Sequence, residues 1–219
     1  MAFSAERSAQ SPIEGFMEQT DDTRERLLAA ALNQFADRGF YGASIAQIAG
    51  ELGLTKQALL YYFKRKEDLY AEVLRRISDR LLEAMHSGVG QDDNPGMQFE
   101  GMMLGIYNEA QARPLDTRVL LRELLDNQRR NAPEDQWYLK TFLDAVVAQL
   151  NKVEGMDELP FERKFASVYQ MLSAIEYFTV SGQTLTRMYG KDTFARITEA
   201  YPEALREQVR RLIDGAGKS

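Results

Sequence analysis

Two short helical patterns follow one another almost directly in this chain, with only Gly53 and Leu54 between the first helix and the cap of the second. Apolar residues recur at helical spacing over residues 45–52 and again over residues 56–63. Two helices this short and this close cannot lie antiparallel as a simple hairpin, so they must cross at a steep angle. The sequence therefore predicts a helix-turn-helix motif over about residues 45–64.

The turn and the two helix starts of this motif have suitable residues. Gly53 can adopt the left-handed backbone conformation that a tight turn needs. Ser44 is the expected N-cap of the first helix, with Gln47 as its capping-box partner. Thr55 is the expected N-cap of the second helix. The local chemistry therefore agrees with the motif that the helix lengths predict.

The remaining chain shows helical periodicity and no strand-like alternation of useful length. A helix is expected over residues 22–38, with Asp21 and Asp22 at its start and Gly39 at its end. Residues 1–20 lack apolar periodicity and are expected to form a flexible leader. The predicted fold is therefore all-α. The further helices are expected over residues 66–87, 97–112, 115–130, 134–153, 160–189, 193–200 and 202–214.

Residues 22–70 resemble the DNA-binding domain of the tetracycline-repressor (TetR) family of bacterial transcriptional regulators. Four features carry the resemblance, and their joint spacing is specific, whereas each one alone is common. They are a helix ending in F-x-x-x-G-F, the pair Ala43-Ser44, the run I-A-x-x-x-G-L-T-K and the run Y-F-x-x-K-E-x-L.

The resemblance implies a three-helix DNA-binding domain over residues 21–70 and a larger helical domain over residues 71–219 that binds an effector and dimerises. The expected function is that of a repressor that binds a palindromic operator on double-stranded DNA as a homodimer. A small hydrophobic effector is expected to release it. The alternative is an activator or architectural DNA-binding protein that works without a ligand. Since no catalytic motif, cofactor site or metal site is found, no enzymatic activity is expected.

The resemblance also assigns residues to the DNA contact. Ser44 and Lys66 match positions that usually contact phosphates at the starts of two helices, and Tyr41 is a further candidate. Physically, a glutamine can bond both edge groups of an adenine, and an alanine can pack on a thymine methyl group. The recognition-helix face is expected to comprise Thr55, Lys56, Gln57, Ala58 and Tyr61.

One position departs from the usual pattern of the family. Many members have a tyrosine after the leucine of the recognition helix, with its hydroxyl on a phosphate, whereas this chain has Leu60. Either Tyr61 or Tyr62 supplies that contact instead, or the contact is absent. Tyr62 and Phe63 also have the helical spacing of core residues, so packing is the competing interpretation for both.

Larger apolar side chains in the second domain suggest where an effector could bind. Methionine and aromatic side chains make adaptable pocket walls, although ordinary core packing explains the same residues. The candidates are Met102, Met103, Tyr107, Trp137, Phe142, Tyr169 and Phe178. The expected helix over residues 160–189 also has a broad apolar face, which would pack against a second copy in a four-helix bundle or form internal core. That face comprises Phe165, Val168, Met171, Leu172, Ile175, Phe178, Thr179 and Leu185.

Charge and composition limit the other possibilities. The net charge of −6 argues against a generally basic nucleic-acid coat, so attraction to DNA must be local. Residues 21–76 carry nine basic and eight acidic side chains, against a clear acidic excess after them. With one histidine and no cysteine, the spacing Glu83-x-x-His86 does not suffice for a metal site. No apolar run is long enough for a membrane span, so a soluble, cytoplasmic protein without a membrane partner is expected.

Overall fold

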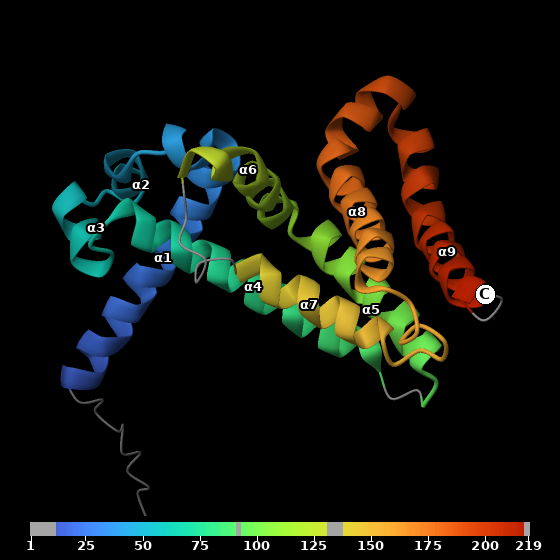
Figure 1. Ribbon diagram of the computed structural model, residues 1–219. Helices are drawn as coiled ribbons and strands as arrows, with labels where there is room; N and C mark the ends of the chain where they lie inside the picture. The colour runs from blue at the N-terminus through green and yellow to red at the C-terminus, as the bar shows by residue number, and fades with distance from the viewer. Residues whose placement is uncertain (1–11, 91–92, 131–137, 217–219) are drawn as a thin grey trace, which may run out of the picture. The chain divides into compact units, whose positions relative to one another are not determined.

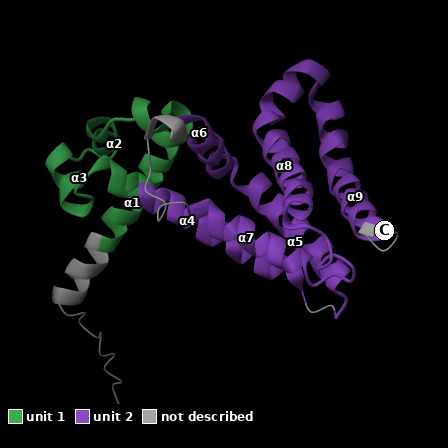
Figure 2. Cartoon of the chain, viewed as in Figure 1, with its two compact units in different colours: residues 1–70 green, residues 71–219 purple. Residues whose placement is uncertain are grey.

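The computed structural model describes residues 12–90, 93–130 and 138–216, and all regular secondary structure in those residues is helical (Figure 1). This confirms the predicted all-α fold. The chain divides into two compact units, residues 1–70 and residues 71–219 (Figure 2). The helices are α1 (Pro12–Gly42), α2 (Ile45–Glu51), α3 (Lys56–Tyr62), α4 (Lys66–Val89), α5 (Pro95–Ala112), α6 (Pro114–Arg130), α7 (Tyr138–Leu150), α8 (Phe161–Tyr189) and α9 (Lys191–Ala216).

The first unit has a small apolar core shared by α1, α2 and α3. Phe35, Ile48 and Leu59, one from each helix, are fully buried. α2 packs against both α1 and α3. Gly53 has a φ of 68° in the turn between α2 and α3, a conformation that costs glycine little. The predicted helix-turn-helix motif is therefore present, and its helix ends lie within one residue of the prediction.

α1 differs from the prediction at its start. It begins at Pro12, so the expectation of a leader without regular structure is wrong from Pro12 onward, and residues 1–11 lie outside the described residues. A proline at the first helical position has a suitable fixed φ, and extending an existing helix costs much less than nucleating one. The regular helix is interrupted where predicted, because Gly39 has a φ of 68° and a ψ of 177°.

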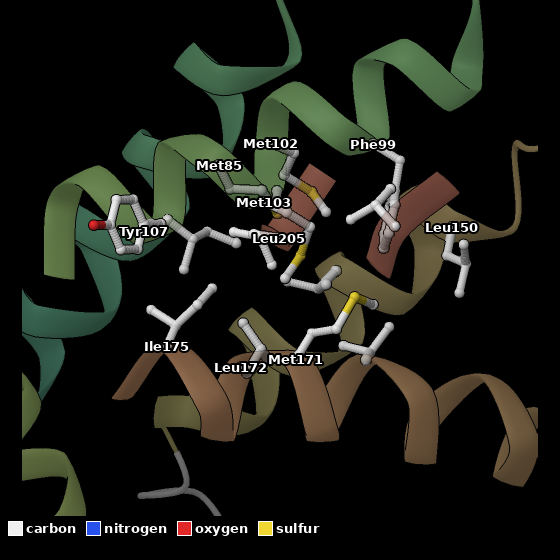
Figure 3. Packing of buried hydrophobic residues seen from close by; sticks show 14 of the residues in the cluster. Met85, Phe99, Met102, Met103, Tyr107, Leu150, Met171, Leu172, Ile175 and Leu205 are labelled. Carbon is white, nitrogen blue, oxygen red and sulfur yellow. The ribbon is translucent and has the colours of Figure 1, made fainter. Parts of the chain in front are cut away.

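The second unit has a larger core formed by α5, α7, α8 and α9 together with the inner face of α4. Figure 3 shows Met102 and Met103 of α5 close to Met171 and Leu172 of α8 in this core. The unbranched methionine side chains can fill irregular gaps between helices that do not run parallel. No helix in the described part of the chain is long and apolar enough to cross a membrane.

α9 is one continuous helix, although two helices were predicted with a break before Pro202. Proline lacks the N–H that would bond the carbonyl four residues earlier, which favours a break. Here packing on both sides of the proline outweighs that loss. The Tyr201 ring stacks on the rings of Phe178 (4.1 Å between centroids) and Tyr107 (5.1 Å), and Leu205 is buried one turn later.

The other helices agree with the prediction to within two residues, except at the end of α7. α7 ends at Leu150 instead of residue 153, and turns follow it, so this boundary was wrong. The expected start of that helix, residues 134–137, lies outside the described residues.

Candidate nucleic-acid interface and ligand cavity

α3 has one face in the core and another in solvent. Its start is fixed by Thr55, whose hydroxyl oxygen accepts a hydrogen bond of 3.2 Å from the backbone N–H of Ala58, so the predicted N-cap is confirmed. Thr55, Lys56 and Gln57 are exposed, Ala58 is half-buried, and Tyr61 is 76% exposed. The expected recognition face is therefore accessible on a helix that is held from behind.

The aromatic residues at the end of α3 have different environments. Phe63 is buried, with the Arg24 guanidinium 5.1 Å from its ring centre, which confirms that it belongs to the core. Tyr62 is half-buried and packs edge-on against the exposed Tyr61 ring at 5.3 Å. Leu60 is half-buried and offers no hydroxyl. Tyr61 is thus the phenol on this helix with the freest access to a partner.

Ser44 lies at the N-cap position of α2 with an extended backbone, but its side chain makes no capping hydrogen bond. The Gln47 side-chain oxygen accepts a hydrogen bond of 3.3 Å from Arg38 and does not pair with Ser44. The predicted capping box is therefore wrong. The half-buried Ser44 hydroxyl and the exposed Tyr41 ring, which packs edge-on against Phe40, flank the start of α2.

The basic cluster after α3 is not one uniform surface. Lys64 and Arg65 are exposed, and Arg65 forms an ion pair of 2.7 Å with Asp68. The hydrogen bond from Arg65 lowers the pKa of the Asp68 carboxyl. Lys66, expected at a phosphate, is half-buried, and its ammonium donates hydrogen bonds to backbone carbonyls of Phe40 and Ala43.

A cavity of about 600 Å³ lies in the second unit among α4, α6, α7 and α8. One wall is a row of three rings on α8, where Phe165 lies 5.7 Å from Phe161 and stacks on Tyr169 at 5.5 Å. This row has the spacing i, i+4, i+8, which places three aromatic side chains on one face of a helix and can be seen in the sequence. The lining residues are Leu74, Ser78, Leu120, Glu123, Leu124, Tyr138, Leu139, Lys140, Leu143, Asp144, Phe161, Phe165 and Tyr169.

Of the seven residues expected in an effector pocket, the six that the structure describes are not brought together in one pocket. Tyr169 lines the cavity, and Trp137 lies outside the described residues. The other five belong to the buried core cluster: Met102, Met103, Tyr107, Phe142 and Phe178. The α8 stripe expected at a dimer interface is also largely core, since Val168, Met171, Leu172, Ile175 and Phe178 are buried inside the unit.

No group of acidic or histidine side chains suited to a metal ion occurs among the described residues. His86 is exposed at the last turn of α4, which agrees with the interpretation that it is a surface residue.

Comparison with known proteins matches residues 27–73 to the family described as "Bacterial regulatory proteins, tetR family". The HTH-type transcriptional regulator RutR of Escherichia coli K12 is 48% identical over 56 residues, a match that spans 26% of this chain and only 26% of RutR. The HTH-type transcriptional regulator AcrR of Shigella flexneri is 34% identical over 163 residues, covering 72% of this chain and 70% of AcrR. A TetR family transcription regulator from Marinobacter aquaeolei VT8 shares the fold, with a TM-score of 0.69 at 17% identity over 88% of this chain and 96% of that one.

Proposed function

Because the chain belongs to the TetR family of bacterial transcriptional regulators and is therefore a DNA-binding regulator, we propose that it is a ligand-released repressor. In this proposal a dimer binds a palindromic operator and leaves it when a small apolar effector occupies the second unit. The observation that carries the proposal is that α3 presents an exposed polar face while the cavity in the second unit is lined in part by α4.

The proposed DNA face consists of the exposed side of α3 and the segment before α2. Gln57 would bond an adenine edge in the major groove, and Ala58 would pack against a thymine methyl group. Tyr61 would take the phosphate contact that Leu60 cannot make, which its exposure supports. Ser44 and Tyr41 would contact the backbone of the DNA, and Tyr62 would support Tyr61 through its ring.

A dimer would place two such faces on half-sites roughly 34–36 Å apart, so that both contribute in one binding event. The apolar stripe of α8 is used within the chain, so the dimer surface must come from other residues. Tyr177, Met188 and Tyr189 are large, exposed and on the same helix, and Tyr177 is 74% exposed. We propose that these side chains are covered by the second copy.

The effector would bind in the cavity of about 600 Å³, a size that suits a drug-sized molecule. The lining is mainly leucine and aromatic side chains, with Glu123, Lys140 and Asp144 as its charged members. The Lys140 ammonium is paired with Asp144 at 2.5 Å. An apolar, largely aromatic molecule without a negative charge fits this lining best.

α4 offers a physical connection between the two sites. It is continuous from Lys66 to Val89, so it begins in the first unit and continues into the second. Leu74 and Ser78 of this helix line the cavity. A ligand that prefers a different position of α4 would shift the population away from the DNA-binding conformation by its difference in affinity for the two states.

Footprinting on the DNA that flanks the gene tests the proposal. We expect two protected half-sites related by a twofold axis, and loss of protection with an apolar compound selected by thermal shift. Asymmetric protection would contradict the dimer on a palindrome. Protection that no cavity ligand alters would favour the alternative of a ligand-independent activator or architectural protein.

A further inference from the structure

The ammonium group of Lys66 lies against the end of α1. Its Nζ donates hydrogen bonds of 2.8 Å to the carbonyl oxygen of Phe40 and 3.2 Å to that of Ala43. The same atom lies 4.4 Å from the centre of the Phe40 ring. One half-buried cation therefore contacts three groups in a segment that precedes it by more than twenty residues.

These contacts satisfy a local need of the first unit. Carbonyl groups at a helix end lack intrahelical partners and carry a partial negative charge, so a cation is favourable there. Bonds from an ammonium are stronger than bonds between neutral groups, and the ring face adds a further attraction. An ammonium has three N–H donors. With two of them used inside the protein and the ammonium held against the Phe40 ring, Lys66 has at most one N–H left for a DNA phosphate.

The segment that Lys66 holds carries candidate DNA contacts. Tyr41 lies between the two carbonyl groups, and Ser44 follows the second of them directly. One turn after Lys66 on α4, the Tyr70 ring packs on the Phe35 ring of α1 at 4.7 Å between centroids. The Lys66 side chain thus links the start of α4, which follows α3, to the segment that precedes α2. The two ends of the helix-turn-helix motif are therefore joined by hydrogen bonds.

We propose that the Lys66 side chain is a positioning residue, which holds Tyr41 and Ser44 in place for the DNA backbone and is not itself a phosphate ligand. The resemblance to the TetR family implied that Lys66 contacts a phosphate. In this proposal its side chain does not, and only its backbone N–H is left for such a contact. The inference rests on the DNA face proposed above, but it predicts a property of the protein without DNA as well.

Salt dependence separates a positioning lysine from a phosphate ligand. Each lysine that neutralises a phosphate adds about 0.9 to the slope of log Kobs against log salt concentration for duplex DNA. The slope is to be measured by fluorescence anisotropy with full-length protein and a random-sequence duplex of about 30 base pairs between roughly 50 and 200 mM salt, since nonspecific binding depends on phosphate contacts. The variants are Lys66→Met and, as the matched loss of an exposed charge on α3, Lys56→Met.

We expect Lys66→Met to keep the slope of the unaltered protein while its affinity falls severalfold, whereas the loss of a phosphate ligand would lower the slope by about 0.9 for each bound copy. Lys56→Met shows how far the loss of an exposed charge on α3 alone changes affinity and slope. Without DNA, Lys66→Met should lower the thermal unfolding midpoint by about 4 °C. A slope that falls by about 0.9 for each bound copy in Lys66→Met would overturn the inference, and so would an unchanged unfolding midpoint.

Two further measurements keep these outcomes distinct. If Lys66→Met does not fold, Lys66→Gln removes the charge while retaining N–H donors, and its slope is read in the same way. If the unaltered protein itself shows no salt-dependent binding, the proposed DNA face is contradicted. The unfolding midpoint without DNA then still decides whether Lys66 holds α4 to the end of α1.

Discussion

Gly88 on α4 and Gly101 on α5 pack with their backbones in direct contact. A Cβ atom added to Gly88 would lie 2.5 Å from the carbonyl oxygen of Gly101, and one added to Gly101 would overlap the carbonyl oxygen of Gly88. One turn along α5, a Cβ on Gly105 would lie 2.6 Å from the carbonyl oxygen of Ala84. Gly101 and Gly105, four residues apart on α5, therefore set how closely α5 packs on α4, the helix that would transmit the ligand signal.

Gly101→Ala should destabilise the protein by about 1–3 kcal/mol, because the clash is with backbone that cannot move without displacing a helix. Denaturant unfolding measures this change. Gly50→Ala is the matched control, since no atom lies within 4 Å of its added Cβ, and it should stabilise α2 by up to about 1 kcal/mol. Equal effects of the two substitutions would contradict the close packing of α4 and α5.

The ion pair between Arg80 of α4 and Asp116 of α6 is largely buried, with Nη2 of the arginine 2.6 Å from the carboxylate. Asp116→Asn should cost about 2–4 kcal/mol, because it leaves the partly buried guanidinium without its counter-charge. Asp144→Asn removes the partner of the exposed Lys140 and should cost less than about 1 kcal/mol.

A double-mutant cycle with Arg80→Met isolates the interaction energy of the ion pair from the effect of each substitution alone. We expect a coupling energy of about 1–3 kcal/mol from urea unfolding of the four proteins. Additive effects would mean that the pair does not hold α6 to α4.

Burial raises the pKa of the Glu176 carboxyl on α8 to about 7 from an ordinary value of 4.5. The folded state therefore binds a proton more tightly than the unfolded state. The contribution of this protonation to stability is fully present below pH 4.5 and is lost as the pH rises through 7. Glu176→Gln should remove this part of the pH dependence and gain on the order of 2 kcal/mol at pH 8 with little change at pH 4. Parallel stability curves for the two proteins between these values would show that the carboxyl is not desolvated.

Leu124 and Leu125 offer a matched test of the cavity. Leu124 lines the cavity, whereas its neighbour Leu125 is 79% exposed and does not. Leu124→Trp should fill part of the cavity and weaken binding of the neutral fluorescent probe N-phenyl-1-naphthylamine about tenfold or more, while Leu125→Trp should leave it unchanged. Because an unfolded variant would also fail to bind the probe, the thermal unfolding midpoint of each variant is measured alongside the titration. Equal affinity in both folded variants would place the probe elsewhere.

Local interactions explain why the first unit could be predicted from the sequence. The turn at Gly53 and the cap at Thr55 depend on neighbours within a few residues, and both were correct. The continuity of α9 through Pro202 depends on rings from α5 and α8, which no local pattern contains. The proposed role of Lys66 likewise depends on carbonyl groups in a distant segment. Its position in the family pattern indicates where its backbone lies, but not what its side chain contacts.

The cavity escaped prediction for a related reason. Residue type alone does not distinguish a methionine in a closed core from one in a pocket wall, because both are apolar and at helical spacing. Met102 and Met103 face the packed interior, while the aromatic row that ends at Tyr169 faces the cavity. Which face of α8 borders a cavity is decided by how α6 and α7 pack on it, and that packing is not local.

In the proposed complex the exposed face of α3 reads base pairs. This is tested by comparing the operator affinity of Gln57→Ala with that of Gln183→Ala, which removes the same side chain from an exposed position of α8. The probes are the footprinted operator and a random-sequence duplex of the same length. We predict that Gln57→Ala weakens operator binding by about 1–3 kcal/mol, relaxes preference at one base pair of each half-site and leaves random-duplex binding unchanged. If Gln57→Ala bound the operator with the same affinity and base preference as Gln183→Ala, that result would contradict base reading by the exposed face of α3.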